Sequence, residues 1–140
     1  MTHVFPISSA IFLFIVSLLH FYWAFGGKWG TDSVIPTTAD HSRRTFSPRK
    51  GGTIVVACLL TSAAYLLLAQ GSYLPPLIAP SLIQWGCIVC AAVFILRAVG
   101  DFNYIGFFKK VKNTKFARQD TALFTPLCLW LGMSFLLALF

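Results

Sequence analysis

Four titratable residues of this sequence could carry chemistry together: His20, Arg97, Asp101 and Asp120. A histidine can act as a general acid or base, and a neighbouring carboxylate can orient it. An arginine can hold a phosphate or a carboxylate through paired N–H groups. Arg97 and Asp101 are four residues apart, a spacing that puts two side chains on one face of a helix. The elements that carry the four residues decide whether they meet.

Those elements follow from three long stretches without a charged side chain, residues 1–27, 51–96 and 121–140. Only 11% of the 140 residues are charged, whereas a soluble domain carries about 25%. A helix that crosses the hydrocarbon core needs roughly 20 apolar residues. The middle stretch is long enough for two such helices, and Pro75 and Pro76 mark a turn within it. We therefore predict an all-α membrane protein, one domain of residues 1–140, with four transmembrane helices at about 4–25, 53–70, 80–99 and 121–140.

The basic residues predict the orientation of these helices. All 11 lysines and arginines lie within residues 28–50 and 97–120. Four spans place both regions on one side of the membrane, and an excess of basic residues marks the cytoplasmic side. We expect loops 26–52 and 100–120 to be cytoplasmic and both termini to lie on the opposite side.

This topology brings the four titratable residues to one level near the cytoplasmic boundary. His20 falls in the last turns of the first helix, and Arg97 and Asp101 fall at the end of the third. Asp120 precedes Thr121-Ala122-Leu123 and is expected to cap the fourth helix. Ionisable groups at membrane depth by default indicate function. The residues that we expect to line a ligand site at this level are His20, Tyr22, Trp23, Arg97, Asp101, Tyr104 and Lys109.

These residues also have structural interpretations. Arg97 could extend its guanidinium to the lipid headgroups, and Asp101 could serve only to neutralise Arg97. Tyr22 and Trp23 are typical of the aromatic belt at a membrane interface. His20 could bond a neighbouring helix instead of a ligand.

The segment between the third and fourth helices combines aromatic and basic residues. Five basic residues run from Lys109 to Arg118, and the aromatic residues of the segment are Phe102, Tyr104, Phe107, Phe108 and Phe116. Such a segment is expected at the membrane interface, with its cations near anionic headgroups. A second interpretation is specific capture of a phosphate or carboxylate by Arg97, Lys109 and Lys110. We expect the aromatic residues of a segment beside the membrane to contact lipid instead of nucleic-acid bases. We therefore expect no nucleic-acid partner.

The cysteines do not form a convincing redox or metal site. Cys58, Cys87, Cys90 and Cys128 all fall within predicted spans. The Cys87-x-x-Cys90 spacing is similar to that of quinone-linked thiol oxidoreductases, but no predicted loop holds a second cysteine pair. We interpret the cysteines as small apolar packing residues and expect no metal and no cofactor.

Four blocks of the sequence together resemble a known family. They are HFYWAFGG at residues 20–27, LRAVGDFNYIGFFKK at 96–110, TKFARQDT at 114–121 and PLC at 126–128. This pattern is similar to a bacterial family of small four-helix integral membrane proteins known only as a domain of unknown function. The resemblance implies four spans and a bacterial inner membrane, and it implies no activity, cofactor or ligand.

Three functional hypotheses remain open at this level. The first is a binding or transport protein whose cytoplasmic-side cavity holds an anionic or lipid-like molecule through Arg97 and Lys109. The second is an accessory subunit whose polar layer only fixes helix packing. The third is a small membrane enzyme acting on a lipid or isoprenoid, with His20 as the acid or base and Asp101 as its orienter.

The predicted orientation is tested with reporter fusions. A reporter that is active only outside the cytoplasm should be active when it is fused after Phe140, because both termini are expected on that side. Silence after Phe140, with activity in the 28–50 loop, would reverse the orientation.

Overall fold

The computed structural model describes residues 4–36, 48–100 and 105–140 of the chain. Its long helices are α1 (Val4–Ala24), α3 (Lys50–Gln70) and α4 (Pro80–Val99), followed by a continuous helical stretch from Lys115 to Ala138. That stretch consists of α5 (Lys115–Gln119), a π-helical turn η1 (Asp120–Phe124) and α6 (Thr125–Ala138). All four are long and apolar enough to cross a membrane, so the prediction of an all-α chain with four helices of membrane-spanning length is confirmed.

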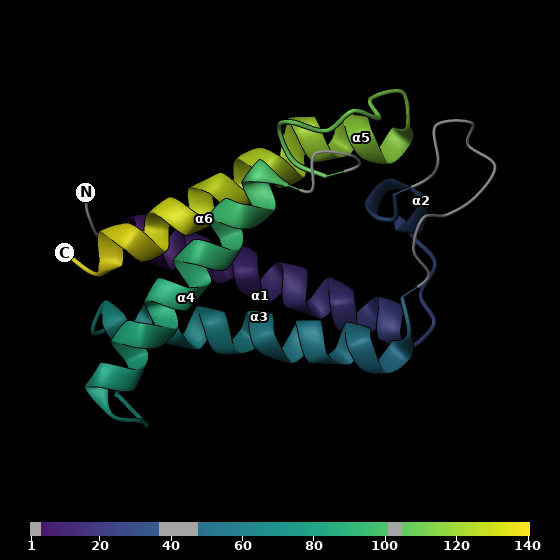
Figure 1. The fold of residues 1–140 in the computed structure, drawn as a ribbon. Helices are drawn as coiled ribbons and strands as arrows, with labels where there is room; N and C mark the ends of the chain where they lie inside the picture. Colours follow the sequence, from purple (N-terminus) through teal and green to yellow (C-terminus); the bar gives the residue numbers. More distant parts are fainter. Residues whose placement is uncertain (1–3, 37–47, 101–104) are drawn as a thin grey trace.

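The helices pack as two pairs, α1 with α3 and α4 with α6 (Figure 1). The pairs lie close together at the end of the bundle where Val4 and Ala138 are found, and they separate toward the opposite end. A short helix, α2 (Thr31–Val34), lies between them at that opposite end and contacts α5. No helix was predicted between the first two spans, so α2 is an addition to the predicted fold.

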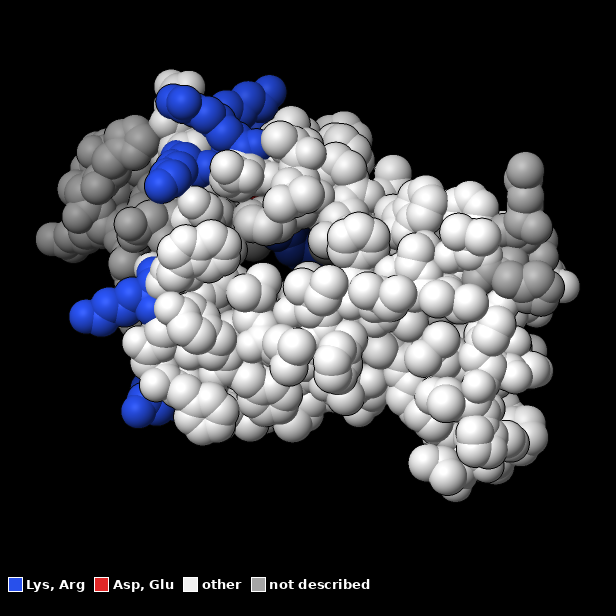
Figure 2. Space-filling view, turned by 180° about the vertical axis from the view of Figure 1, so that it is seen from behind, with Lys and Arg blue, Asp and Glu red and all other residues white. Residues whose placement is uncertain are grey.

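We call this opposite end the basic end, because exposed or partly exposed lysines and arginines gather there. α1 and α4 finish at the basic end, and α3 and α5 begin there. Figure 2 shows the blue basic side chains concentrated at one end of the molecule. The described basic residues of this end, apart from α4, are Lys28, Arg49, Lys50, Lys109, Lys110, Lys112, Lys115 and Arg118.

Close contact within and between the pairs depends on small residues and on hydroxyl groups. Ala57, on α3, is fully buried, and the Ser17 hydroxyl of α1 donates to its carbonyl at 2.7 Å. Between α1 and α6, the hydroxyls of Ser9 and Ser134 lie 2.7 Å apart, and Trp130 Nε1 donates to Ser9 at 2.9 Å. Lipid does not drive apolar helices together, so small-residue packing and interhelical hydrogen bonds hold such a bundle.

The start of the last helix differs from the sequence prediction. The helix begins at Lys115 instead of near residue 121, and Thr114 is its N-cap, with its hydroxyl accepting from the Ala117 N–H at 3.0 Å. The prediction that Asp120 caps the helix is therefore wrong, because Asp120 lies a full turn inside it. The sequence prediction started the helix after Lys115 and Arg118, because the uncharged stretch begins after them. In the structure these two charged residues belong to the helix.

Two glycines bring the chain back against the end of α4. Gly100 and Gly106 both have left-handed backbone angles, with φ of 86° and 89°. A Cβ on Gly100 would collide with the carbonyl oxygen of Ile105, and a Cβ on Gly106 would collide with the carbonyl oxygen of Val99. Phe107 N–H donates to the Ala98 carbonyl at 3.0 Å and closes this contact. We call the contact between Gly100 and Gly106 the glycine clasp.

The glycine clasp predicts a sharp difference between two glycine substitutions. Gly106→Ala should lower the unfolding free energy by at least about 2 kcal/mol, because it combines a left-handed alanine with a backbone collision. Gly52→Ala is the matched control, since Gly52 is helical and its Cβ would meet open space. It should be neutral or stabilising by about 0.5–1 kcal/mol. Denaturant titration in detergent measures both, and equal effects would contradict the clasp.

Candidate functional site

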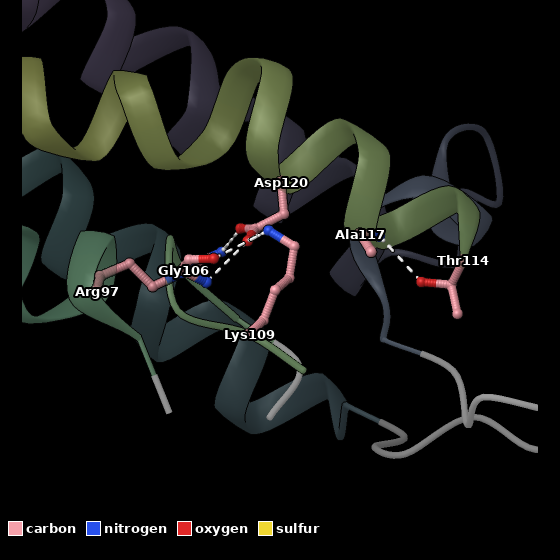
Figure 3. Close-up of polar contacts among 6 residues, drawn as sticks. All are labelled: Arg97, Gly106, Lys109, Thr114, Ala117 and Asp120. Carbon is pink, nitrogen blue, oxygen red and sulfur yellow. Dashed lines mark hydrogen bonds and ion pairs between the residues drawn. The ribbon is translucent and has the colours of Figure 1, made fainter. Parts of the chain in front are cut away.

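The most buried charge in the described chain belongs to Asp120, which is fully shielded from solvent. Three donors surround its carboxylate (Figure 3). Oδ1 accepts from Arg97 Nη2 at 2.9 Å. Oδ2 accepts from the Gly106 backbone N–H at 2.8 Å and from Lys109 Nζ at 2.9 Å. A buried carboxylate is stable only when such partners replace its water, and Asp120 has them on both oxygens.

Each donor comes from a different local structure. Arg97 lies in the last turn of α4, Gly106 belongs to the glycine clasp, and Lys109 follows three residues later. Lys109 Nζ also donates to the Gly106 carbonyl at 2.9 Å, and only 2% of the Lys109 side chain is exposed. Asp120 therefore ties the end of α4 and the segment after the glycine clasp to the fourth helix.

The π-helical turn that begins at Asp120 has a local cause. Pro126 has no N–H, so the regular bond to the carbonyl of Ala122 cannot form. The Thr125 N–H instead donates to the carbonyl of Asp120, five residues back. π-helical turns are frequent at functional sites. Here the turn starts at the residue that gathers the three donors.

The charges of this group do not cancel. We call Arg97, Lys109 and Asp120 the buried charge cluster; its formal sum is one positive charge. Arg97 Nη1 is buried and has no hydrogen-bond partner among the described residues. Yet 31% of the Arg97 side chain is exposed, so the guanidinium lies at the edge of the cluster. An anion beside Nη1 would satisfy both the charge and the free donor.

A hollow opens between the two helix pairs near this level. Figure 2 shows it on the side of the bundle, with a basic side chain visible at its bottom, deeper than the basic residues at the end of the molecule. A different pocket, of about 510 Å³, lies at the other end beside the 71–79 turn. No charged side chain is among the residues that line that pocket, so it offers no cation to an anionic ligand.

The remaining predicted site residues at the end of α1 have local partners. His20 Nδ1 lies 2.8 Å from the Val16 carbonyl, and its ring packs edge-on against Trp23 at 5.2 Å. Trp23 Nε1 donates to the Trp29 carbonyl at 2.8 Å. The ring of Tyr22 lies directly over Gly27. These contacts stay within α1 and the residues that follow it.

The structure thus brings Arg97 and Lys109 together, through Asp120. Asp101 and Tyr104 lie outside the described residues, and so does the predicted Arg97–Asp101 pair. Sequence reasoning placed Asp120 at the right level but did not include it among the ligand-site residues. One feature of the sequence could have indicated the contact between this segment and Asp120. Gly100 and Gly106 flank residues 101–105, and two glycines so close together indicate a turn that reverses the chain.

The sequence of this region also identifies the family. Residues 13–135 match the family described as "Protein of unknown function (DUF3995)". The chain belongs to this family. Its match contains all three residues of the buried charge cluster, as well as His20, Tyr22 and Trp23. No curated protein and no solved structure matches the chain significantly.

The cysteines and other metal-ligand types do not gather in the described part of the chain. Among residues 4–36, 48–100 and 105–140, no group of three histidine, cysteine or acidic side chains could hold a metal ion. Cys87 is buried with its Sγ 3.6 Å from the Leu66 carbonyl, and Cys90 is partly buried on the same helix. Both thiols are free.

The buried charge cluster predicts a large effect of one amide substitution. Asp120→Asn should lower the unfolding free energy by about 3–5 kcal/mol, because the buried Lys109 and the partly buried Arg97 lose their counter-charge. The matched control is Lys110→Met, which removes an exposed cation next to Lys109 and should change stability by less than about 0.5 kcal/mol. Both are measured by unfolding in detergent. An Asp120→Asn protein as stable as the control would show that the cluster contributes nothing.

Proposed function

We propose that the protein binds an anionic or lipid-like small molecule in the hollow beside the buried charge cluster. The observation that carries this proposal concerns Arg97 Nη1, a buried donor that no described residue pairs with, on a cluster of described residues with one excess positive charge. Leaving such a donor unsatisfied costs about 1–3 kcal/mol, more for a charged group. An anionic ligand removes that cost, and the hollow gives it access.

Arg97 and Lys109 have different roles in this proposal. Lys109 donates to both Asp120 and Gly106 and only 2% of its side chain is exposed, so in this proposal it contributes positive potential without contacting the ligand. Arg97 uses Nη2 for Asp120 and presents Nη1 to the ligand. His20, Tyr22, Trp23 and Tyr104 are proposed to line the apolar part of the site. Asp101 is proposed to lie near the site without occupying Nη1, because the carboxylate that holds Arg97 is that of Asp120.

The membrane setting is part of the same proposal. We assign the basic end to the cytoplasmic side of a bacterial inner membrane, with both termini on the other side. Phe107 and Phe108 are 50% and 63% exposed, and the basic residues Lys110, Lys112, Lys115 and Arg118 are exposed near them. Aromatic and cationic side chains in this arrangement suit an interface with anionic headgroups.

A second candidate is an accessory subunit without a ligand. It is favoured by the position of Asp120, which joins α4, the glycine clasp and the fourth helix and so could serve packing alone. The enzymatic alternative needs a carboxylate that orients His20. In the structure, His20 bonds to the Val16 carbonyl, which is not a carboxylate. This contact gives the enzymatic hypothesis no separate support.

Native mass spectrometry of gently extracted protein separates the first two candidates. The wild-type protein should retain a small molecule or lipid, and Arg97→Ala should lose at least about nine tenths of it, since a charge-assisted hydrogen bond is worth about 1.5–3 kcal/mol. Lys112→Ala removes an exposed cation and should retain the ligand. Identical ligand content in wild type and Arg97→Ala would favour the accessory role.

A further inference from the structure

The geometry points to a more specific occupant: a membrane lipid whose headgroup carries a single negative charge, entering through the side of the bundle. This inference rests on the proposed function and names the ligand class of the same site. Three observations support it. They are the net charge of the cluster, the different surroundings of Nη1 and Nη2 of Arg97, and the direction in which the hollow opens.

The charge of the cluster sets the charge of the occupant. Among the described residues, one carboxylate is shared by two cations, so the cluster lacks one negative charge. A phosphodiester headgroup such as that of phosphatidylglycerol supplies one and leaves the site neutral. A zwitterionic headgroup such as that of phosphatidylcholine brings its own cation into a site that is already positive. A phosphomonoester that carries two charges would leave a buried excess of negative charge, which is costly at low dielectric.

The guanidinium of Arg97 can serve two oxyanions at once. Its Nη2 donates to Asp120 Oδ1 at 2.9 Å, which restrains the position of the group. Its Nη1 remains as a second donor of the same planar group. A planar fork held on one side in this way binds a phosphate oxygen on the other with little loss of side-chain entropy. Asp120 is thus a positioning residue for the arginine that contacts the headgroup.

The direction of the hollow selects a lipid over a water-soluble anion. The helices of Figure 1 run across the view, and Figure 2 is the same molecule seen from behind, so the hollow opens through the side of the bundle and not through its end. In a membrane that side faces lipid. The lipid-facing residue next to Arg97, Leu96, is 67% exposed and gives an acyl chain an apolar surface.

The surroundings of the basic end favour the same ligand. Lys110, Lys112, Lys115 and Arg118 are exposed there. Each basic residue near a membrane surface attracts anionic lipid by about 1 kcal/mol. These exposed cations raise the local concentration of anionic lipids of every kind. Arg97 then discriminates among them, because its Nη1 is a buried donor without a partner among the described residues.

The test is lipid retention by full-length protein that has been stripped of lipid and incubated with defined mixtures. Native mass spectrometry would compare phosphatidylglycerol, phosphatidylcholine, phosphatidic acid and soluble glycerol phosphate at equal concentrations. The wild-type protein should retain phosphatidylglycerol at least about tenfold better than phosphatidylcholine, a preference worth about 1.4 kcal/mol. Arg97→Gln should lose that preference, and Lys110→Gln, which removes an exposed cation, should keep it within about twofold.

A second variant keeps the test independent of folding. Arg97→Lys retains a positive charge beside Asp120, but a single ammonium cannot present the second edge of a guanidinium. It should remain folded and lose at least about fivefold in phosphatidylglycerol retention, a change of about 1 kcal/mol. Undiminished retention by a folded Arg97→Lys protein would contradict the assigned role of Nη1.

The remaining outcomes separate this inference from the proposed function. Arg97-dependent binding of glycerol phosphate as strong as that of the lipid would overturn the lipid assignment and keep the anion site. Tighter binding of phosphatidic acid in its doubly charged form would overturn the single charge. Retention of all four compounds that does not depend on Arg97 would end both the inference and the proposed function.

Discussion

The architecture of the basic end depends on the need to neutralise one carboxylate. Asp120 has no exposure to solvent, so its charge must be balanced by groups of the protein itself. The groups that balance it come from the last turn of α4 and from the segment that the glycine clasp returns to that turn. Without the glycine clasp, neither the Gly106 N–H nor Lys109 would reach the fourth helix. Local backbone geometry and buried charge therefore stabilise each other.

The same interaction connects stability to the candidate site. Asp120 accepts from Nη2 of the Arg97 guanidinium, and no residue in the described part of the chain pairs with Nη1. Asp120 also leaves one positive charge in a bundle whose helices are otherwise nearly free of charge. Ionisable residues at membrane depth are energetically costly and by default indicate a functional site. A purely structural cluster would be better served by one cation and one anion than by two cations and one anion.

The sequence was sufficient for the four helices but not for the centre of the site. Uninterrupted apolar runs predicted α1, α3 and α4 within a few residues, because span length is set by membrane thickness. Asp120 was predicted to be a helix cap, since it directly precedes an apolar run. Its real partners include the backbone N–H of Gly106, which points at the carboxylate because Gly106 adopts a left-handed conformation. The types of the side chains do not predict a backbone partner. The π-helical turn before Pro126 also leaves no pattern in the spacing of the apolar residues from which it could be predicted.

The central claim is that Arg97 is held by Asp120 on one edge and is open to an anionic lipid on the other. The most direct measurement is a high-resolution electron cryomicroscopy map of the protein in nanodiscs that contain phosphatidylglycerol. We predict density for a phosphate within hydrogen-bonding distance of Arg97 Nη1, about 3 Å, with an acyl chain leaving through the side of the bundle. A map in which the Asp101 carboxylate occupies Nη1 and side chains fill the hollow would contradict the account.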